Sequence, residues 1–276
     1  MDLCLVGSEM CIRDRVQAGK TIPLGTWTNT LASGIKSVYR ASAIFPIGAV
    51  SKPLEPGEVR PTSDHSATGL NSATDLEGLR HSLNAYEEIA WFLELDYCMR
   101  MSDVEAAFPM LPLHPDVWPF FLFRFFAGPE DTEMSLFANI FGDFGAAGMP
   151  GTFKRFFVDV VVQMARSMHV LTLPMPIYVD DCALIGPCPD EVDAEMVAFH
   201  EWAWDVCGVA FKAIKDRLAA TRQLALGFWW DSETLTRELE ERKLLQYLDM
   251  LATFAVRDKM TLRETVSYTH LRAHET

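Results

Sequence analysis

The stretch PIYVDDCALIG, residues 176–186, places two adjacent aspartates between two apolar runs. Short apolar runs joined by a few turn residues are typical of a β-hairpin, so Asp180 and Asp181 are predicted at its tip. Two neighbouring carboxylates repel each other and resist burial. The tip is therefore either a turn in water or a site that binds a cation.

A third carboxylate ends another predicted strand. The segment YCMRMSD, residues 97–103, alternates in the manner of a strand and finishes on Asp103. If this strand and the hairpin share one sheet, Asp103 meets Asp180 and Asp181 at one edge. Three carboxylates with no basic residue between them suit Mg²⁺, and two such ions promote phosphoryl transfer. For each aspartate alone, a solvated turn is the simpler interpretation.

The remaining chain predicts an α+β fold. The order of elements favours an antiparallel sheet with helices packed on one face, close to the split βαβ motif. Residues 51–75 are predicted to be loop with short strands. Helices are predicted over residues 28–40, 85–97, 104–110, 152–168, 189–207 and 239–257. Further strands are predicted over residues 120–126, 224–231 and 234–239.

Composition restricts the class of protein. The chain has 276 residues, of which 49% are hydrophobic, so a sizeable core is expected. No stretch resembles a membrane span or a signal peptide, and no CxxC pair indicates a zinc site. We therefore expect an intracellular protein, in nucleus or cytoplasm, with no membrane partner. The net charge of −14 argues against a free-standing nucleic-acid binder, which is usually basic.

The surroundings of the three aspartates carry a family resemblance. Asp103 is followed by a small residue, Ala107, and an aromatic one, Phe108, and the hairpin reads YVDD. Together with four further segments in the same order and spacing, this pattern resembles the reverse transcriptases. The further segments are KPLEPGEVRPTSD with Lys52 and Arg60, FGAAGMPGTF with Phe144, Gly145 and Pro150, Lys215 seven residues after Gly208, and LGF with Leu226, Gly227 and Phe228.

The resemblance covers residues 45–260 and implies the fingers and palm of a right-hand polymerase. The implied division is 16–95 for the fingers and N-terminal region, 96–231 for the palm with part of the fingers at 115–150, and 232–265 for the palm end and the start of a truncated thumb. Residues 1–15 and 266–276 are excluded from this division as segments that do not belong to the natural protein. Segments 5–15 and 266–276 are encodable on opposite strands of one DNA sequence, as expected of a sequencing adapter translated by mistake.

The resemblance also implies residue roles. Asp103, Asp180 and Asp181 bind two Mg²⁺, for which Mn²⁺ substitutes, with the Val104 carbonyl as a further ligand. Lys52 and Arg60 contact the triphosphate, and Phe108 excludes a 2′-OH, in a nucleotide site shared with Ala107, Phe144, Gly145 and Pro150. Tyr178, Val179, Leu226, Gly227 and Phe228 contact the primer. Lys215 protonates the pyrophosphate, although Lys212 lies close enough in sequence to take that role.

Several of these residues also have a simpler structural interpretation. Phe108 can be an ordinary core residue, the lysines and the arginine can be solvated surface charges, and Gly145 can form a plain turn at the start of a helix. The expected function is RNA-directed DNA polymerase, with a primed RNA or DNA template and deoxynucleoside triphosphates as partners. An RNA-dependent RNA polymerase and a catalytically inactive palm that binds RNA or protein are the alternatives. Phe108 weighs against the first, because a polar residue is expected there to read a 2′-OH. The oligomeric state is left open.

Overall fold

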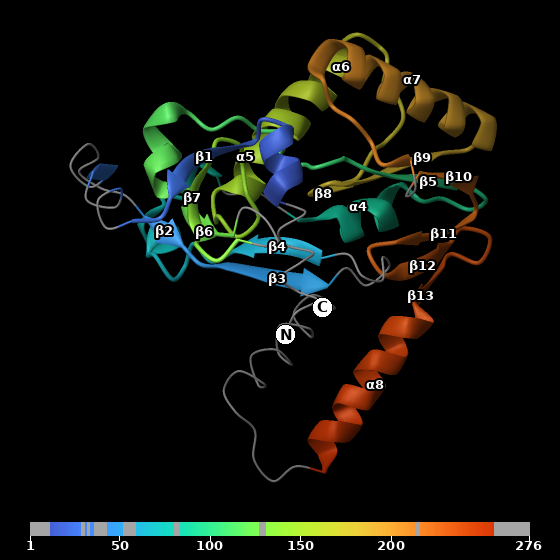
Figure 1. The fold of residues 1–276 in the computed structure, drawn as a ribbon. Coiled ribbons are helices and arrows are strands. Elements are labelled where there is room, and N and C mark those ends of the chain that lie inside the picture. Colours follow the sequence, from blue (N-terminus) through green and yellow to red (C-terminus); the bar gives the residue numbers. More distant parts are fainter. Residues whose placement is uncertain are drawn as a thin grey trace.

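The computed structural model describes residues 12–28, 31, 34–35, 43–51, 59–79, 83–126, 131–213 and 216–256 (Figure 1). The strands are β1 (Thr21–Thr26), β2 (Ile44–Phe45), β3 (Ile47–Ser51), β4 (Val59–Ser63), β5 (Cys98–Asp103), β6 (Leu122–Phe125), β7 (Ser135–Asn139), β8 (Ile177–Tyr178), β9 (Asp181–Gly186), β10 (Arg217–Ala220), β11 (Arg222–Ala225), β12 (Phe228–Asp231) and β13 (Thr236–Leu239). The α-helices are α3 (Leu70–Ala73), α4 (Ala85–Phe92), α5 (Met149–Phe156), α6 (Gln163–Ser167), α7 (Pro189–Cys207) and α8 (Glu241–Ala255). Other helical turns are η1 (Glu77–Leu79), η2 (Pro115–Phe120) and the π-helical η3 (Phe157–Val162).

The central sheet has the strand order β10-β5-β9-β8, and its neighbouring strands are antiparallel. Alternation along β5 sends Met99 and Met101 to one face and Arg100 and Ser102 to the other. The methionines pack with Ile185 in one apolar cluster, whereas Leu184 from the same hairpin belongs to a second, larger cluster. The sheet is therefore buried on both faces.

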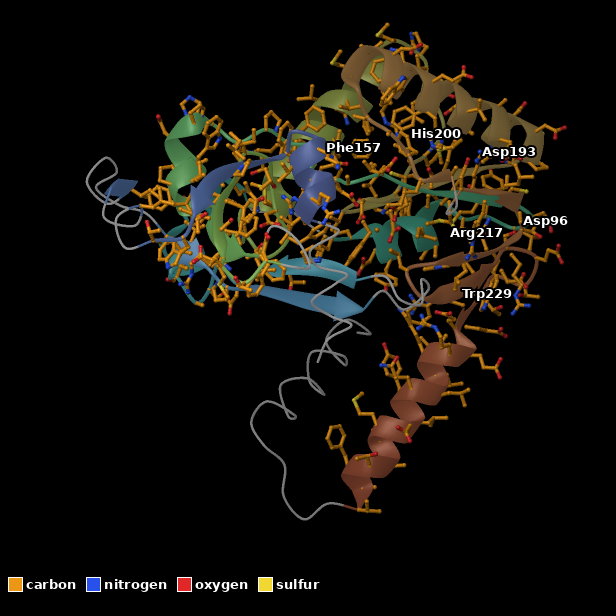
Figure 2. All side chains as sticks on the ribbon, in the orientation of Figure 1. Asp96, Phe157, Asp193, His200, Arg217 and Trp229 are labelled. Atoms are coloured by element: carbon orange, nitrogen blue, oxygen red, sulfur yellow. The ribbon has the colours of Figure 1, made fainter. Side chains whose placement is uncertain are left out.

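Both faces carry a covering layer. α7 packs on β5, β9 and β10 from one side, with the side chains of Asp193 and His200 between helix and sheet (Figure 2). α4 contacts β9 and β11 contacts β5 on the opposite side, where Figure 1 places them below the sheet. The prediction of helices on one face was incomplete, because the apolar face of Met99 and Met101 is also covered, by residues of α4, β11 and β12.

α7 begins and ends where predicted. Pro189 stands at the first turn, where its missing N–H costs nothing, and Asp190 and Glu191 complement the positive end of the helix. Gly208 ends the helix at φ 68°, a left-handed conformation that favours glycine. The predicted helix over 152–168 is also confirmed as the run α5, η3 and α6, which begins at Met149.

A second sheet has the strand order β1-β7-β6-β2, in which β2 and β6 are parallel. The aromatic run predicted as a strand supplies β6, and Phe123 stacks on Phe137 of β7 with ring centroids 5.2 Å apart. β3 and β4 form a separate antiparallel pair in which Val50 faces Arg60. No helix in the described part of the chain is long and apolar enough to cross a membrane.

Two predicted elements were wrong. Residues 104–110 form a turn, not a helix: Ala106 has φ 51°, and the N–H groups of Val104 and Glu105 donate to Asp180 and Ala210 at 2.9 and 2.8 Å. The predicted strand 224–231 is a hairpin, because Leu226 and Gly227 have φ 53° and 85° and reverse the chain between β11 and β12.

The other predictions differ in their limits. The helix predicted over 85–97 ends at Phe92, and most of the helix predicted over 28–40 lies outside the described residues. The strands at β5, β6 and β13, the hairpin at β8–β9 and the helix α8 are confirmed.

Candidate functional site

The sheet brings the three aspartates together. Asp103 is the last residue of β5 and faces Asp181, the first residue of β9. Directly opposed residues of an antiparallel pair project to the same face, with Cβ atoms about 5 Å apart. The N–H of Val104 donates to the carbonyl of Asp180 at 2.9 Å, which ties the hairpin tip to the end of β5. The predicted meeting of the three residues at one sheet edge is thus present in the backbone.

The pKa of Cys182 is affected by the negative charge of the three aspartates. Its side chain is fully buried, and its pKa is raised well above the ordinary value, first by burial and then by the charges of Asp181, Asp180 and Asp103. All three carboxylates therefore act on one point in the core. Cys182 is therefore a neutral thiol within the core.

Asp103 is only 1% exposed, and a buried carboxylate needs a counter-charge. The ammonium of Lys212 supplies it by an ion pair with Asp103 Oδ1, while the Lys212 N–H donates to the Asp103 carbonyl at 2.9 Å. Within the described residues, no three His, Cys, Asp or Glu side chains are grouped closely enough to hold a metal ion. The donor atoms nevertheless suit a hard cation, because all are carboxylate oxygens and the position at Asp103 already attracts a positive charge.

The turn of the hairpin is unusual. Tyr178 faces Asp181, so Val179 and Asp180 form a two-residue turn. Val179 has φ 56°, a left-handed conformation that is costly for a β-branched residue. Such strain persists only where the surrounding structure enforces it and is concentrated at functional sites.

The FGAAGMPGTF segment joins two other predicted motifs. Gly145 has φ 99°, and a Cβ added there would lie 2.1 Å from the Ser63 carbonyl in β4. Phe144 packs on Phe108 with ring centroids 5.0 Å apart. The turn therefore contacts both the strand that carries Arg60 and the segment that follows Asp103.

Phe108 lies in an aromatic cluster. It is 9% exposed and contacts Phe153 edge-on at 6.1 Å as well as Phe144. Ala107 beside it is 3% exposed, and Pro150 stands in the first turn of α5. These contacts agree with the interpretation of Phe108 as a core residue, and they hold its ring in a fixed position in the segment that follows Asp103.

Three predicted cationic residues stay untested by this geometry. Lys52 and Lys215 lie outside the described residues, and the side chain of Arg60 does as well, although its backbone lies in β4. Lys212, the alternative to Lys215, is the lysine that reaches Asp103.

A cleft of about 470 Å³ connects the hairpin to the LGF turn. Tyr86 links its walls, because its hydroxyl donates to the Leu226 carbonyl at 2.8 Å and its ring meets Phe228 and Tyr178 edge-on at 5.7 and 6.3 Å. The cleft is lined by Tyr86, Tyr178, Asp181, Leu224, Leu226, Gly227, Phe228, Leu239, Lys243 and Tyr247. Sequence reasoning missed Tyr86, Lys243 and Tyr247, since they carry no motif and come from α4 and α8.

A buried polar cluster beside Gly145 was also missed. The Asp143 carboxylate accepts hydrogen bonds from Ser63 Oγ and from Asn139 Nδ2, the latter at 2.8 Å, and it pairs with Arg15 at 3.4 Å. Burial alone would raise the pKa of Asp143, but the contacts with His65, Arg15 and Ser63 outweigh it and lower the pKa. Arg15 belongs to the segment predicted as adapter-derived, and the structure packs it against this cluster.

Solved structures supply the comparisons with known proteins. No protein-family model and no curated protein matches the chain. A foamy viral protease–reverse transcriptase in complex with double-stranded DNA aligns with TM-score 0.71 and 17% identity over 98% of this chain and 40% of its own. The same kind of protein with an RNA/DNA hybrid aligns with TM-score 0.62 and 18% identity, over 94% of this chain and 29% of its own. The native prototype foamy virus protease–reverse transcriptase aligns with TM-score 0.61 and 17% identity, over 96% of this chain and 33% of its own.

These alignments establish a reverse-transcriptase-like fold, and the chain spans at most 40% of the length of these three structures.

Proposed function

We propose that the chain is an RNA-directed DNA polymerase domain, which adds deoxynucleotides to a primer 3′-OH and releases pyrophosphate. The observation that carries the proposal is the register of β5 and β9, which sets Asp103 against Asp181 while the Asp180 carbonyl is bonded to Val104. The reverse-transcriptase-like fold supports it, since foamy viral structures of that fold contain double-stranded DNA or an RNA/DNA hybrid.

Asp103, Asp180 and Asp181 would hold two Mg²⁺, with Mn²⁺ as a substitute and the Val104 carbonyl as a further ligand. Bound there, the ions lower the pKa of the 3′-OH and neutralise charge on the triphosphate. Lys212, whose ammonium pairs with Asp103, stands beside the proposed metal site and would contact phosphate oxygens bound there. Arg60, Lys52 and Lys215 are proposed to contact the triphosphate and pyrophosphate.

The cleft between the hairpin and the LGF turn would receive the primer terminus. Aromatic rings of Tyr86, Tyr178 and Phe228 can stack on a base or sugar, and the Lys243 ammonium can pair with a backbone phosphate. Val179 and the Leu226–Gly227 turn would fix the position of the last nucleotide. The aromatic rings and the lysine in this lining favour nucleic-acid binding at the cleft, although the net charge of the whole chain is −14.

Template-directed addition is tested with a labelled DNA primer on an RNA template of defined sequence, in Mg²⁺, with one nucleotide supplied at a time. Extension should occur with the complementary deoxynucleotide and stay slow with the other three. Preference for ribonucleotides would favour the RNA-polymerase alternative. Absence of extension by a chain that binds the primed template would favour the inactive palm.

Phe108 provides a prediction on sugar selection. Phe108→Val should raise ribonucleotide use relative to deoxynucleotide use by about 10- to 100-fold, because the smaller side chain leaves room for a 2′-OH. Single-nucleotide addition rates for the matched pair of triphosphates measure this ratio. Phe153→Val is the control, since Phe153 packs against Phe108 but is fully buried. An equal change of the ratio in both variants would mean that Phe108 acts only through packing.

Lys243 provides a prediction on primer binding. Lys243→Ala should weaken binding of a primed template by about tenfold, because one phosphate contact is lost from the cleft. Fluorescence anisotropy at fixed salt measures the dissociation constant. Arg242→Ala removes the same charge from the neighbouring position on α8, where Arg242 pairs with Glu240 outside the cleft lining, and should change binding about twofold or less. Equal losses in the two variants would contradict a specific role for Lys243.

A further inference from the structure

The turn that carries Gly145 and Ala147 has little regular structure of its own. Residues 144–148 lie between Phe141 and the start of α5, and they belong to no helix or strand. Four of these five residues are glycine or alanine, so the backbone has many accessible conformations and few side chains to restrict them. Contacts from another part of the chain must therefore hold the turn in one conformation.

The segment that follows β4 supplies these contacts. It runs from Ser63, the last residue of β4, to Leu79, the last residue of η1, and it packs along the turn and α5. A Cβ added at Gly145 would collide with the Ser63 carbonyl, and one added at Gly151 would collide with the Leu79 carbonyl. Glycine at both positions thus permits backbone to approach backbone.

Asn71 of α3 reaches the turn from the middle of this segment. Its Nδ2 donates to the Gly145 carbonyl at 2.9 Å, and its Oδ1 accepts from the Ala147 N–H at 2.9 Å. One side chain therefore bridges two backbone groups that are two residues apart in the turn.

The two hydrogen bonds require a carboxamide at position 71. Gly145 offers an acceptor and Ala147 a donor, so the side chain must present one donor and one acceptor side by side. An ionised carboxylate has the same shape but cannot donate to a carbonyl. The two partners also fix the orientation of the amide, because exchanging its oxygen and nitrogen would set like groups against each other.

The loop before α3 is anchored in the core, so Asn71 is presented from a fixed base. The His65 ring is fully buried, and its centroid lies 4.2 and 5.0 Å from those of Phe45 and Phe121. The Thr68 hydroxyl donates to the His65 carbonyl at 3.1 Å, which closes the loop between His65 and α3.

We propose that Asn71 is a positioning residue, whose carboxamide clamps the Gly145–Ala147 turn against the segment that follows β4. Its importance for nucleotide binding rests on the proposed function, in which this turn and Arg60 of β4 belong to the nucleotide site, whereas the clamp itself does not. Without the clamp, an incoming nucleotide would have to order the turn as it binds. Nucleotide affinity should therefore suffer more than the rate of addition at saturation.

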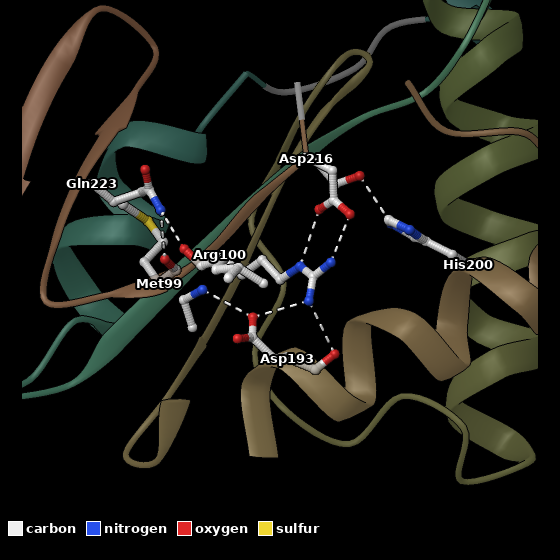
Figure 3. Close-up of polar contacts among 9 residues, drawn as sticks. Met99, Arg100, Asp193, His200, Asp216 and Gln223 are labelled. Carbon is white, nitrogen blue, oxygen red and sulfur yellow. Dashed lines mark hydrogen bonds and ion pairs between the residues drawn. The ribbon is translucent and has the colours of Figure 1, made fainter. Parts of the chain in front are cut away.

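Two other residues supply matched controls. Ser66 Oγ accepts from Asn71 Nδ2 at 3.0 Å, so Ser66→Ala removes one hydrogen bond of Asn71 and leaves the two to the turn. Gln223 is a second carboxamide that binds backbone, since its Nε2 donates to the carbonyls of Met99 and Leu218 at 3.1 and 3.0 Å in the central sheet (Figure 3). Gln223→Met removes two backbone hydrogen bonds elsewhere in the fold and should lower the melting temperature.

Hydrogen exchange of the Ala147 amide measures the clamp, resolved by NMR in the full chain without nucleotide. Asn71→Ala should accelerate this exchange about tenfold or more, because the amide loses its acceptor. In single-nucleotide addition, the nucleotide KM of Asn71→Ala should rise about tenfold while the maximum rate stays within about threefold of the parent. Ser66→Ala and Gln223→Met should each leave the exchange rate and the KM within about twofold of the parent.

Parent-like exchange at Ala147 in Asn71→Ala would overturn the clamp. Equal acceleration in Gln223→Met would overturn it as well, since the change would then reflect a general loss of stability. Faster exchange with an unchanged KM would overturn the positioning role. If Asn71→Ala does not fold, Asn71→Ser takes its place with the same expected results, because the serine hydroxyl is too short to bridge both backbone groups. A parent chain that extends no primer would refute the proposed function, and the exchange rate would still decide the clamp.

Discussion

Asp181→Asn should slow nucleotide addition by about 10³-fold, which corresponds to roughly 4 kcal/mol of transition-state stabilisation. Asparagine keeps the size of the side chain but removes a negative charge from the position opposite Asp103. The fold should persist, with a melting temperature within about 3 °C of the parent. Mg²⁺ should raise the melting temperature of the parent and have less effect on the variant, because a ligand that binds only the native state stabilises it.

Glu105→Gln is the control for Asp181→Asn. It removes the same charge two residues after Asp103, from an exposed side chain in the turn. Its addition rate should stay within about twofold of the parent. A comparable loss of rate in both variants would show that net charge at the edge matters rather than a specific ligand position.

Gly145→Ala should lower the free energy of unfolding by about 3 kcal/mol. The added Cβ would meet the Ser63 carbonyl at 2.1 Å, and φ 99° is strained for any residue with a side chain. Relief requires β4 and the Phe144 turn to separate, which would also shift the proposed nucleotide site. Urea denaturation measures the stability, and nucleotide KM measures the site.

Gly148→Ala is the matched control in the same segment. Gly148 has φ −78°, and the nearest atom to an added Cβ is Leu79 Cδ1, the end of a side chain, at 3.2 Å. Its stability should change by about 1 kcal/mol or less. If Gly145→Ala is as stable as Gly148→Ala, the contact between the turn and β4 is not required.

Much of the fold follows from local signals. The hairpin around Asp180, the strand ending on Asp103 and the limits of α7 were predicted because apolar alternation, a turn and a proline–glycine pair each act locally. The meeting of the three aspartates required only that the two strands share a sheet.

The failures have a common physical cause. The turn after Asp103 has helical composition, but its N–H groups are used by Asp180 and Ala210, which are distant in sequence. Leu226 adopts a left-handed conformation that its residue type disfavours, so no local pattern marks the hairpin. Tertiary contacts override propensity at both places.

The sequence placed Asp103 and Asp181 at adjoining strand ends, as the register of β5 and β9 has them, but it did not indicate the residues around them. Lys212 was considered only as a substitute for Lys215, because its ion pair with Asp103 joins residues that are distant in sequence. Tyr86 and Lys243 line the cleft only because α4 and α8 fold against the same turn.

Mn²⁺ binding followed by electron paramagnetic resonance tests whether Asp103, Asp180 and Asp181 form a metal site. The full chain should bind Mn²⁺, Mg²⁺ should compete for the same site, and Asp103→Asn and Asp181→Asn should each weaken binding by about tenfold or more. Glu105→Gln should bind as the parent does. Parent-like binding by both aspartate variants, or no binding by the parent, would rule out a metal site at these aspartates and favour an inactive palm.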